Sequence, residues 1–370
     1  MTILVCIPCL LTGGTEIQTL SLVEALVAAG HRPVVACYFE YAEAMVGRYR
    51  QTGAEVVLMN ESGMRPNGIR PTVMHLWRGF RSIVKRYHPQ VAHVQYMAPG
   101  ALPILILRVL GIKKIIATAH TAADIYPSLN QIHWLNKHIL TAFQCITLRA
   151  EISFFGSCRL FDGNIELRKH GNHFTIYNNL PSYITLSATP RTTFSRTIGV
   201  VSRLEEIKGM DLVIPAFAKV HASYPDLKLL IVGDGSLRQL MEQQVEDSGL
   251  PDGSVTFAGR QPQDRLQHYY DKIDILLMPS RSEGFGLTAI EGMARGCVPV
   301  VSDVGGLPEV VEDAVCGFIY NHNSADALAD AMMTAVSTDT AHLSAAAIRT
   351  ASRFSKQQYQ SQISILYKII

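Results

Sequence analysis

Two acidic residues stand eight positions apart around a glycine-rich turn, in the stretch SRSEGFGLTAIEGMARG that begins at Ser280. Glu283 precedes the glycines, and Glu291 lies in an apolar run whose spacing predicts a helix beginning near Leu287. Because side chains on a helix tilt toward its N-terminus, Glu291 is predicted to reach back toward a ligand at that end. A carboxylate is repelled by phosphate but accepts hydrogen bonds from hydroxyls, so the two acids fit a hydroxylated ring such as a sugar or a ribose.

A second set of residues fits phosphate. Arg203 and Lys208 leave one predicted strand together, and two cations on one loop can clamp a diphosphate. The turn at Gly233 brings backbone close to a ligand, and the helix after Gly286 offers free amides and the hydroxyl of Thr288. Together with the acids, these residues predict a nucleoside diphosphate that carries a sugar.

The loops that carry these residues can meet only if the strands before them end at the same edge of a sheet. The sequence predicts two sets of such strands. Segments rich in Val and Ile alternate with helical segments in residues 1–180 and again in residues 197–354. This pattern predicts an α/β protein with two Rossmann-like, doubly wound parallel-sheet domains facing a cleft, because such strands are buried on both faces. Residues 181–196, rich in Ser, Thr and Pro, are the predicted linker, and the C-terminal helix at 355–370 is expected to pack back on the first domain.

The composition is that of a globular protein. The chain has 370 residues, 48% of them hydrophobic and 17% charged, and single cores rarely grow past ~250 to 300 residues. Its longest apolar runs are about half of the ~20 residues that span a bilayer, and no signal peptide is evident, so a cytoplasmic location is expected. Seven cysteines, with no second pair beside Cys6 and Cys9, favour neither a zinc site nor a disulfide framework.

Charge divides unevenly along the chain. Residues 1–180 carry 17 Lys and Arg against 10 Asp and Glu, a net +7, whereas residues 181–370 carry 16 against 21, a net −5. The basic half predicts an anionic partner such as a phosphorylated or lipid-linked acceptor; no nucleic acid is expected. Within it, residues 74–88 predict a basic helix with a broad apolar side. That pattern fits an anionic membrane surface, with the protein peripheral on the inner face, or an ordinary helix covering the sheet.

The acid pair, the basic pair and the segments VGDG, GGLPE and GGTE together resemble the retaining glycosyltransferases of family 4, which have the GT-B fold. The likeness spans nearly the whole chain and is more specific in its second half. It implies that Glu283 binds hydroxyls of the donor sugar, Glu291 the ribose, and Arg203 with Lys208 the diphosphate. It implies a position near the donor sugar for His120. The other candidates for donor binding are Gly13, Gly14, Gly233, Arg260, Phe285, Gly286, Leu287 and Thr288.

The resemblance also implies a mechanism. The diphosphate leaves from the face that the acceptor attacks, and its own oxygen takes the acceptor proton. No Asp-x-Asp triplet occurs in the sequence, so a metal-bound diphosphate lacks its usual protein ligand. We therefore expect no metal and no cofactor, with basic side chains and a helix N-terminus stabilising the leaving group. The chain departs from the family at NNLP, where the family often has Asn-Gly.

The sequence thus predicts a retaining, metal-independent hexosyltransferase. Its donor is a nucleoside-diphosphate sugar, with UDP favoured on family frequency alone, and its acceptor a hydroxyl of a glycan or lipid-linked molecule in cell-surface polysaccharide or lipopolysaccharide biosynthesis. A GDP-mannose-dependent mannosyltransferase, a GT-B nucleotide-sugar epimerase or phosphorylase, and a non-catalytic carbohydrate-binding protein stay open. A nicotinamide-dependent oxidoreductase fits less well, because GDGSLR at Gly233 has arginine where the third glycine of its fingerprint belongs.

Overall fold

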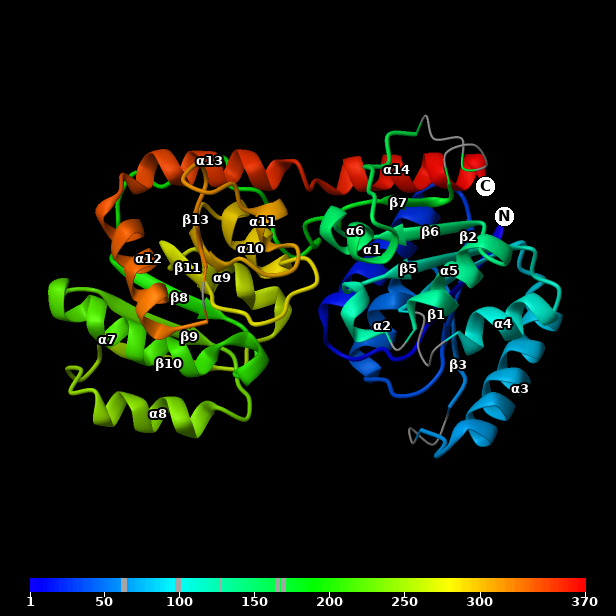
Figure 1. Ribbon diagram of the computed structural model, residues 1–370, viewed down its shortest axis with the longest axis horizontal. Coiled ribbons are helices and arrows are strands. Elements are labelled where there is room, and N and C mark those ends of the chain that lie inside the picture. Colours follow the sequence, from blue (N-terminus) through cyan, green and yellow to red (C-terminus); the bar gives the residue numbers. More distant parts are fainter. Residues whose placement is uncertain (61–64, 97–100, 127, 164–166, 168–170, 322) are drawn as a thin grey trace. The chain divides into compact units, whose positions relative to one another are not determined.

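A computed structural model describes residues 1–60, 65–96, 101–126, 128–163, 167, 171–321 and 323–370 (Figure 1). The chain divides into two compact units. Unit 1 comprises Met1–Asn179 with Lys356–Ile370, and unit 2 comprises Leu180–Ser355. The residues 181–196 that the sequence predicts as a linker belong to unit 2. The guanidinium of Arg191 donates a 2.6 Å hydrogen bond to the carbonyl of Tyr270 and lies 3.4 Å from the carboxylate of Asp274.

Unit 1 is built on a parallel sheet with the strand order β3-β2-β1-β4-β5-β6-β7 among the described residues. The strands are β1 (Thr2–Ile7), β2 (Arg32–Cys37), β3 (Glu55–Leu58), β4 (Val91–Gln95), β5 (Lys114–Ala119), β6 (Ala142–Cys145) and β7 (His173–Thr175). Both faces of β1 are buried, since Leu4 and Cys6 on one face and Ile3 and Val5 on the other have no exposed surface. Helices must therefore cover the sheet on both sides.

The helices of unit 1 cover both faces of its sheet. They are α1 (Gly14–Ala28), α2 (Glu43–Gln51), α3 (Ile69–Tyr87), α4 (Leu102–Val109), α5 (Leu129–His138), α6 (Leu148–Phe155) and α14 (Lys356–Ile369), with a short 3₁₀ turn, η1 (Ala123–Ile125). Leu4 and Cys6 share one core with apolar side chains of α3 to α6. On the opposite face, the hydroxyl of Tyr367 in α14 shares a 2.8 Å hydrogen bond with Nδ1 of buried His93 in β4. The C-terminal helix, red in Figure 1, is thus part of unit 1 and packs along α1.

Unit 2 repeats this architecture with the strand order β10-β9-β8-β11-β12-β13, again all parallel among the residues described. The strands are β8 (Thr197–Val201), β9 (Lys228–Val232), β10 (Val255–Gly259), β11 (Ile275–Met278), β12 (Val298–Ser302) and β13 (Phe318–Tyr320). The helices are α7 (Val213–Ser223), α8 (Arg238–Asp247), α9 (Leu266–Tyr270), α10 (Leu287–Ala294), α11 (Leu307–Val310), α12 (Ala325–Ser337) and α13 (Thr340–Ser352), with 3₁₀ turns η2 (Glu206–Lys208), η3 (Met210–Leu212) and η4 (Gln263–Arg265). The prediction of two doubly wound parallel sheets is confirmed.

Candidate functional site

Two of the predicted site residues in unit 2 meet in an ion pair. Lys208 ends η2, and its ammonium lies 2.6 Å from a carboxylate oxygen of Glu283, which follows β11. Only 20% of the Lys208 side chain and 16% of the Glu283 side chain are exposed, so water screens the pair less than it screens a surface salt bridge. An ammonium has three donors, and a carboxylate can accept further hydrogen bonds, so each group can still bind a ligand.

Two glycines hold the loops that carry this pair. Gly209 follows Lys208 with φ +67°, and a β-carbon there would lie 1.8 Å from the carbonyl oxygen of Pro279. Gly305 has φ +53°, and a β-carbon there would lie 1.6 Å from the carbonyl oxygen of Glu283 itself. Any larger residue at either position would push the backbone away, so these glycines fix where Lys208 and Glu283 stand.

Arg203, the second predicted cation, lies exposed at the rim of a hollow of about 580 Å³. The hollow is also lined by Glu205, Glu206, Ile207, Arg281 and Ser282. Sequence reasoning did not single out Arg281, although it stands two residues before Glu283. Its guanidinium makes a bidentate ion pair with Asp211, at 2.6 and 2.7 Å, and this carboxylate raises the pKa of Arg281. The hollow is therefore lined by two guanidinium groups, of which that of Arg281 is paired with Asp211, and by two acidic residues.

Helix α10 begins where the sequence predicts, with Gly286 as its N-cap at φ 101°. Phe285 is buried and packs edge-on against Phe354, with ring centroids 5.6 Å apart. Leu287 and Thr288 open the helix and are partly buried. The first amides of a helix lack partners within it, so this terminus favours an anion, as predicted for the diphosphate.

Glu291 lies one turn into α10 and is buried, with 4% of its surface exposed. Its carboxylate accepts hydrogen bonds from two tyrosine hydroxyls, that of Tyr183 at 2.7 Å and that of Tyr270 at 2.6 Å. Burial raises the pKa of Glu291 to about 7, although the two hydroxyls favour the ionised form. The sequence offered no sign of either tyrosine, because they come from distant segments.

The two remaining candidates of unit 2, Gly233 and Arg260, differ in their surroundings. Gly233 follows β9 with φ 145°, and a β-carbon there would lie 1.8 Å from the carbonyl oxygen of Ser202, so it holds the turn predicted for it. Arg260 is exposed beyond β10, at the edge of the sheet. Within the described part of the chain, Arg260 makes no hydrogen bond or ion pair with the other candidates. Its role in donor binding stays a prediction.

In unit 1, Gly13 and Gly14 form the start of α1, with Gly13 as the N-cap. The carboxylate of Glu16 lies against this turn: a β-carbon on Gly13 would be 2.6 Å from Oε2 of Glu16. Glu16 is buried and accepts a 3.4 Å hydrogen bond from the thiol of Cys9. The motif GGTE contains Glu16, but only the fold shows that its carboxylate is buried at the helix terminus.

His120 stands directly after β5 and is 7% exposed. Its Nε2 lies 2.9 Å from Oε1 of Gln95, at the end of the neighbouring strand β4. An amide oxygen only accepts, so Nε2 donates in this arrangement and Nδ1 is left as an acceptor. Tyr96 stacks on the imidazole. Burial lowers the pKa of His120 to about 3, so the ring is neutral at physiological pH and suits a hydrogen-bonding role.

The basic helix predicted at 74–88 is part of α3. Leu76, Phe80, Ile83 and Tyr87 are buried in the core of unit 1, so the apolar side packs inward as in an ordinary covering helix. The exposed side carries a surface that we call the α3 basic surface, formed by Arg70, Arg78, Arg81, Lys85 and Arg86. Residues 65–88 contain six Lys and Arg and no Asp or Glu.

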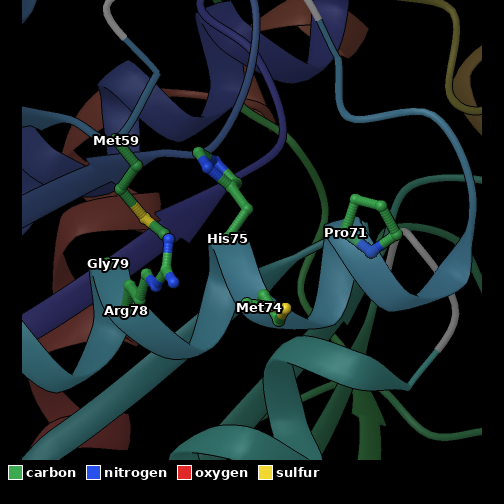
Figure 2. Close-up of a pocket in the computed structure, with 6 residues that line it drawn as sticks. All are labelled: Met59, Pro71, Met74, His75, Arg78 and Gly79. Atoms are coloured by element: carbon green, nitrogen blue, oxygen red, sulfur yellow. The ribbon is translucent and has the colours of Figure 1, made fainter.

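A hollow of about 460 Å³ adjoins this surface. Figure 2 shows its lining, which comes from α3 except for Met59 beyond β3: Met59, Pro71, Met74, His75, Arg78 and Gly79. The side chain of Met74 is half exposed. The hollow thus combines apolar side chains with the guanidinium of Arg78.

No helix in the described residues combines the length and the apolar character needed to cross a membrane.

Comparison with known proteins identifies both halves of the chain. Residues 12–161 match the family described as Glycosyltransferase Family 4, and residues 189–361 match the family described as Glycosyl transferases group 1. The D-inositol 3-phosphate glycosyltransferase of Corynebacterium urealyticum is 30% identical over 183 residues, which are 47% of this chain and 43% of that protein. The chain therefore spans less than half the length of this curated relative.

Solved structures agree over the full length of the chain. HepE from Anabaena, in complex with UDP, matches with a TM-score of 0.79 at 18% identity, covering 100% of both chains. The lipopolysaccharide outer core galactosyltransferase WaaB matches with a TM-score of 0.74 at 15% identity, again covering 100% of both. At such identities the likeness shows the fold alone. From the two family matches and the two parallel-sheet units, the chain belongs to glycosyltransferase family 4 and has the GT-B fold.

Proposed function

We propose that the chain is a retaining glycosyltransferase that moves a sugar from a UDP-sugar to a hydroxyl of a glycan or lipid-linked acceptor. The observation that carries this proposal is the ion pair of Lys208 with Glu283. It joins a cation suited to a diphosphate and an acid suited to sugar hydroxyls at the carboxyl edge of one parallel sheet, where such sheets bind ligands. Unit 2 then binds the donor, and unit 1 the acceptor.

In this proposal, the reaction depends on stabilising the departing diphosphate. Lys208, Arg203 and the free amides of α10 supply positive charge where negative charge develops, each close charge pair contributing about 4 kcal/mol at an effective dielectric near 20. The departing diphosphate oxygen takes the proton of the attacking hydroxyl, and retention follows. His120 of unit 1, being neutral, is suited to a hydrogen bond with a sugar hydroxyl. No metal enters this scheme.

The choice of UDP is supported by the fold's likeness to HepE in complex with UDP. A thermal-shift screen with UDP-, GDP- and ADP-sugars tests it, because a ligand at 100 times its dissociation constant stabilises by ~2.7 kcal/mol. The preferred donor is then incubated with and without acceptor, and the anomeric configuration of the product is read by NMR. An inverted product, a response to GDP-mannose alone, or conversion of the nucleotide sugar without transfer would each replace this proposal with another.

We further propose that the acceptor is anionic and meets the enzyme at a membrane, in cell-surface polysaccharide or lipopolysaccharide assembly. The α3 basic surface supports this, since a row of basic residues without an acid attracts anionic lipid headgroups at ~1 kcal/mol for each residue near the surface. The hollow beside it, lined by Met59, Met74 and Arg78, suits an apolar group next to a phosphate (Figure 2). The anionic cytoplasmic leaflet would place the enzyme in the cytoplasm, peripheral on the inner face of the membrane.

Flotation with vesicles of phosphatidylcholine and phosphatidylglycerol tests this membrane proposal. The double variant Arg81→Gln, Lys85→Gln removes two charges from the α3 basic surface and is expected to lose most vesicle binding. The matched control is Lys113→Gln, Lys114→Gln, which removes two exposed charges elsewhere in unit 1. Equal binding by the two variants, or no binding by the wild type, would contradict the proposal.

A further inference from the structure

The carboxylate of Glu291 is covered by two tyrosines of different character. Tyr270 belongs to α9, has no exposed surface, and donates to Oε2. Tyr183 donates to Oε1 from a turn outside any helix or strand, and its side chain is partly exposed. The hydroxyl of Tyr270 is therefore held in the core of unit 2, whereas that of Tyr183 is held by a segment at the surface of unit 2.

This difference decides how a ligand can reach Glu291. With 4% of its surface exposed, the carboxylate has no room for a ligand hydroxyl unless a neighbour moves. Tyr270 cannot withdraw without opening the core. Tyr183 can withdraw by a local change in residues 181–196, which breaks its hydrogen bond to the Glu291 carboxylate and removes the cover that its ring provides.

Resting on the proposed function, we propose that a ribose hydroxyl of a bound nucleotide replaces the hydroxyl of Tyr183 as the donor to Oε1 of Glu291. The hydroxyl of Tyr270 keeps the carboxylate in position. Tyr183 is then a specificity-determining residue. A nucleotide with ribose hydroxyls forms a new hydrogen bond to the carboxylate that offsets the cost of displacing Tyr183, whereas a nucleotide without these hydroxyls forms no such bond. Tyr270 is a positioning residue that stays bonded throughout.

Two variants that each remove one phenol oxygen separate these roles. Tyr183→Phe lowers the cost of displacing the ring, so its affinity for UDP is expected to rise about tenfold to hundredfold, the contribution of one hydrogen bond to a charged group. Its affinity for 2′,3′-dideoxy-UDP is expected to stay unchanged. Tyr270→Phe is expected to weaken UDP binding, because the carboxylate loses the hydroxyl that orients it.

The measurement is titration calorimetry of wild type and variants with UDP, GDP and their 2′,3′-dideoxy forms, at about pH 8.5 so that Glu291 stays ionised. Tyr269→Phe is the matched control, since it removes a phenol oxygen from the residue next to Tyr270 and is expected to leave all affinities unchanged. Glu291→Gln, which keeps the shape of the side chain, is expected to abolish the gain seen in Tyr183→Phe.

The outcomes separate this inference from the proposed function. If the wild type binds UDP or GDP and Tyr183→Phe leaves the ratio of ribo- to dideoxynucleotide affinity unchanged, Tyr183 is merely structural and the inference is overturned. If Tyr183→Phe and Tyr270→Phe shift affinity in the same direction, the assignment of distinct roles is overturned. If the wild type binds no nucleotide at all, the proposed function itself falls.

Discussion

The phenol ring of Tyr96 stacks on the imidazole of His120, with ring centroids 5.9 Å apart and planes 12° apart. Tyr96 has φ +66°, in the left-handed region that a side chain other than glycine rarely adopts. Such backbone conformations cost ~1 to 3 kcal/mol and persist where the surrounding structure imposes them. The strained residue therefore lies directly against the one histidine among the predicted site residues.

Removing the ring of Tyr96 should expose His120. In Tyr96→Ala we expect the pKa of His120 to rise from about 3 toward its ordinary value, because burial is what lowers it. Histidine NMR titration measures this directly. Tyr96→Phe keeps the ring and should leave the titration as in the wild type; a similar titration in Tyr96→Ala would show that Tyr96 does not shield the imidazole.

Lys208 and Glu283 should act as a unit in the proposed transfer. Lys208→Met and Glu283→Gln are each expected to lower kcat/KM for the preferred donor by about 10²- to 10³-fold, as for other groups that stabilise developing charge or hold the substrate. Because the two side chains are in contact, the double variant should lose less than the product of the single losses.

The matched control for this pair is Lys219 with Asp326, an exposed ion pair of unit 2. Lys219→Met and Asp326→Asn should leave turnover unchanged, since exposed pairs contribute little. If the double variant lost kcat/KM by the full product of the two single losses, Lys208 and Glu283 would act independently of each other.

The stability of unit 2 should fall as pH rises through the titration of Glu291. Burial raises the pKa of Glu291 to about 7, from an ordinary value of 4.5 for a glutamate carboxyl. The stabilising effect of the protonated form is thus fully present below pH 4.5 and lost as pH rises through about 7. The shift corresponds to a free energy of unfolding on the order of 3 kcal/mol.

Glu291→Gln should remove this dependence and leave unit 2 more stable than the wild type at pH 8 or so. Unfolding followed by denaturant titration at several pH values measures it, with the exposed Glu246→Gln as control. A variant whose stability changes with pH as the wild type does would show that Glu291 is not the titrating group.

The stability of unit 1 should fall as pH falls, in contrast to that of unit 2. Burial lowers the pKa of His93 to about 3, with a smaller effect from His120. The folded state therefore resists protonation, and stability that is complete above pH 6.5 is lost as pH falls toward 3. Hydrogen exchange of β4 amides between these limits checks this expectation, and protection that does not fall with pH would contradict it.

The hydroxyl of Tyr367 should be needed to anchor α14. Tyr367→Phe leaves Nδ1 of His93 buried without its partner and is expected to destabilise unit 1 by about 1 to 3 kcal/mol. Thermal unfolding measures the loss. Lys356→Ala, which removes a partly exposed ion pair of the same helix with Glu24, should cost less than ~1 kcal/mol.

Transfer should need no divalent metal. Activity with the preferred donor is expected to be the same after dialysis against EDTA as before it, because side chains and helix amides supply the positive charge in the proposed scheme. Restoration of a lost activity by added Mg²⁺ or Mn²⁺ would contradict this prediction.

The sequence by itself determined the architecture and the types of residue at the strand ends. Runs of Val and Ile can be buried on both faces only in a parallel sheet covered by helices, so the doubly wound fold followed from their alternation. Glu283, Lys208 and the glycines of unit 2 could be proposed as candidates for a similar reason, since their local spacing already constrains the loops and the start of α10.

Only the tertiary structure decided which side chains meet. Tyr183, Tyr270 and Glu291 are separated by as many as 108 positions, and Gln95 and Tyr96 join His120 across neighbouring strands. No local spacing encodes such contacts, because they depend on strand order and on where each loop leaves the sheet. The same reason explains residues 181–196. Their composition predicts a linker, yet they belong to unit 2, where Arg191 and Tyr183 form hydrogen bonds with residues that lie far along the chain.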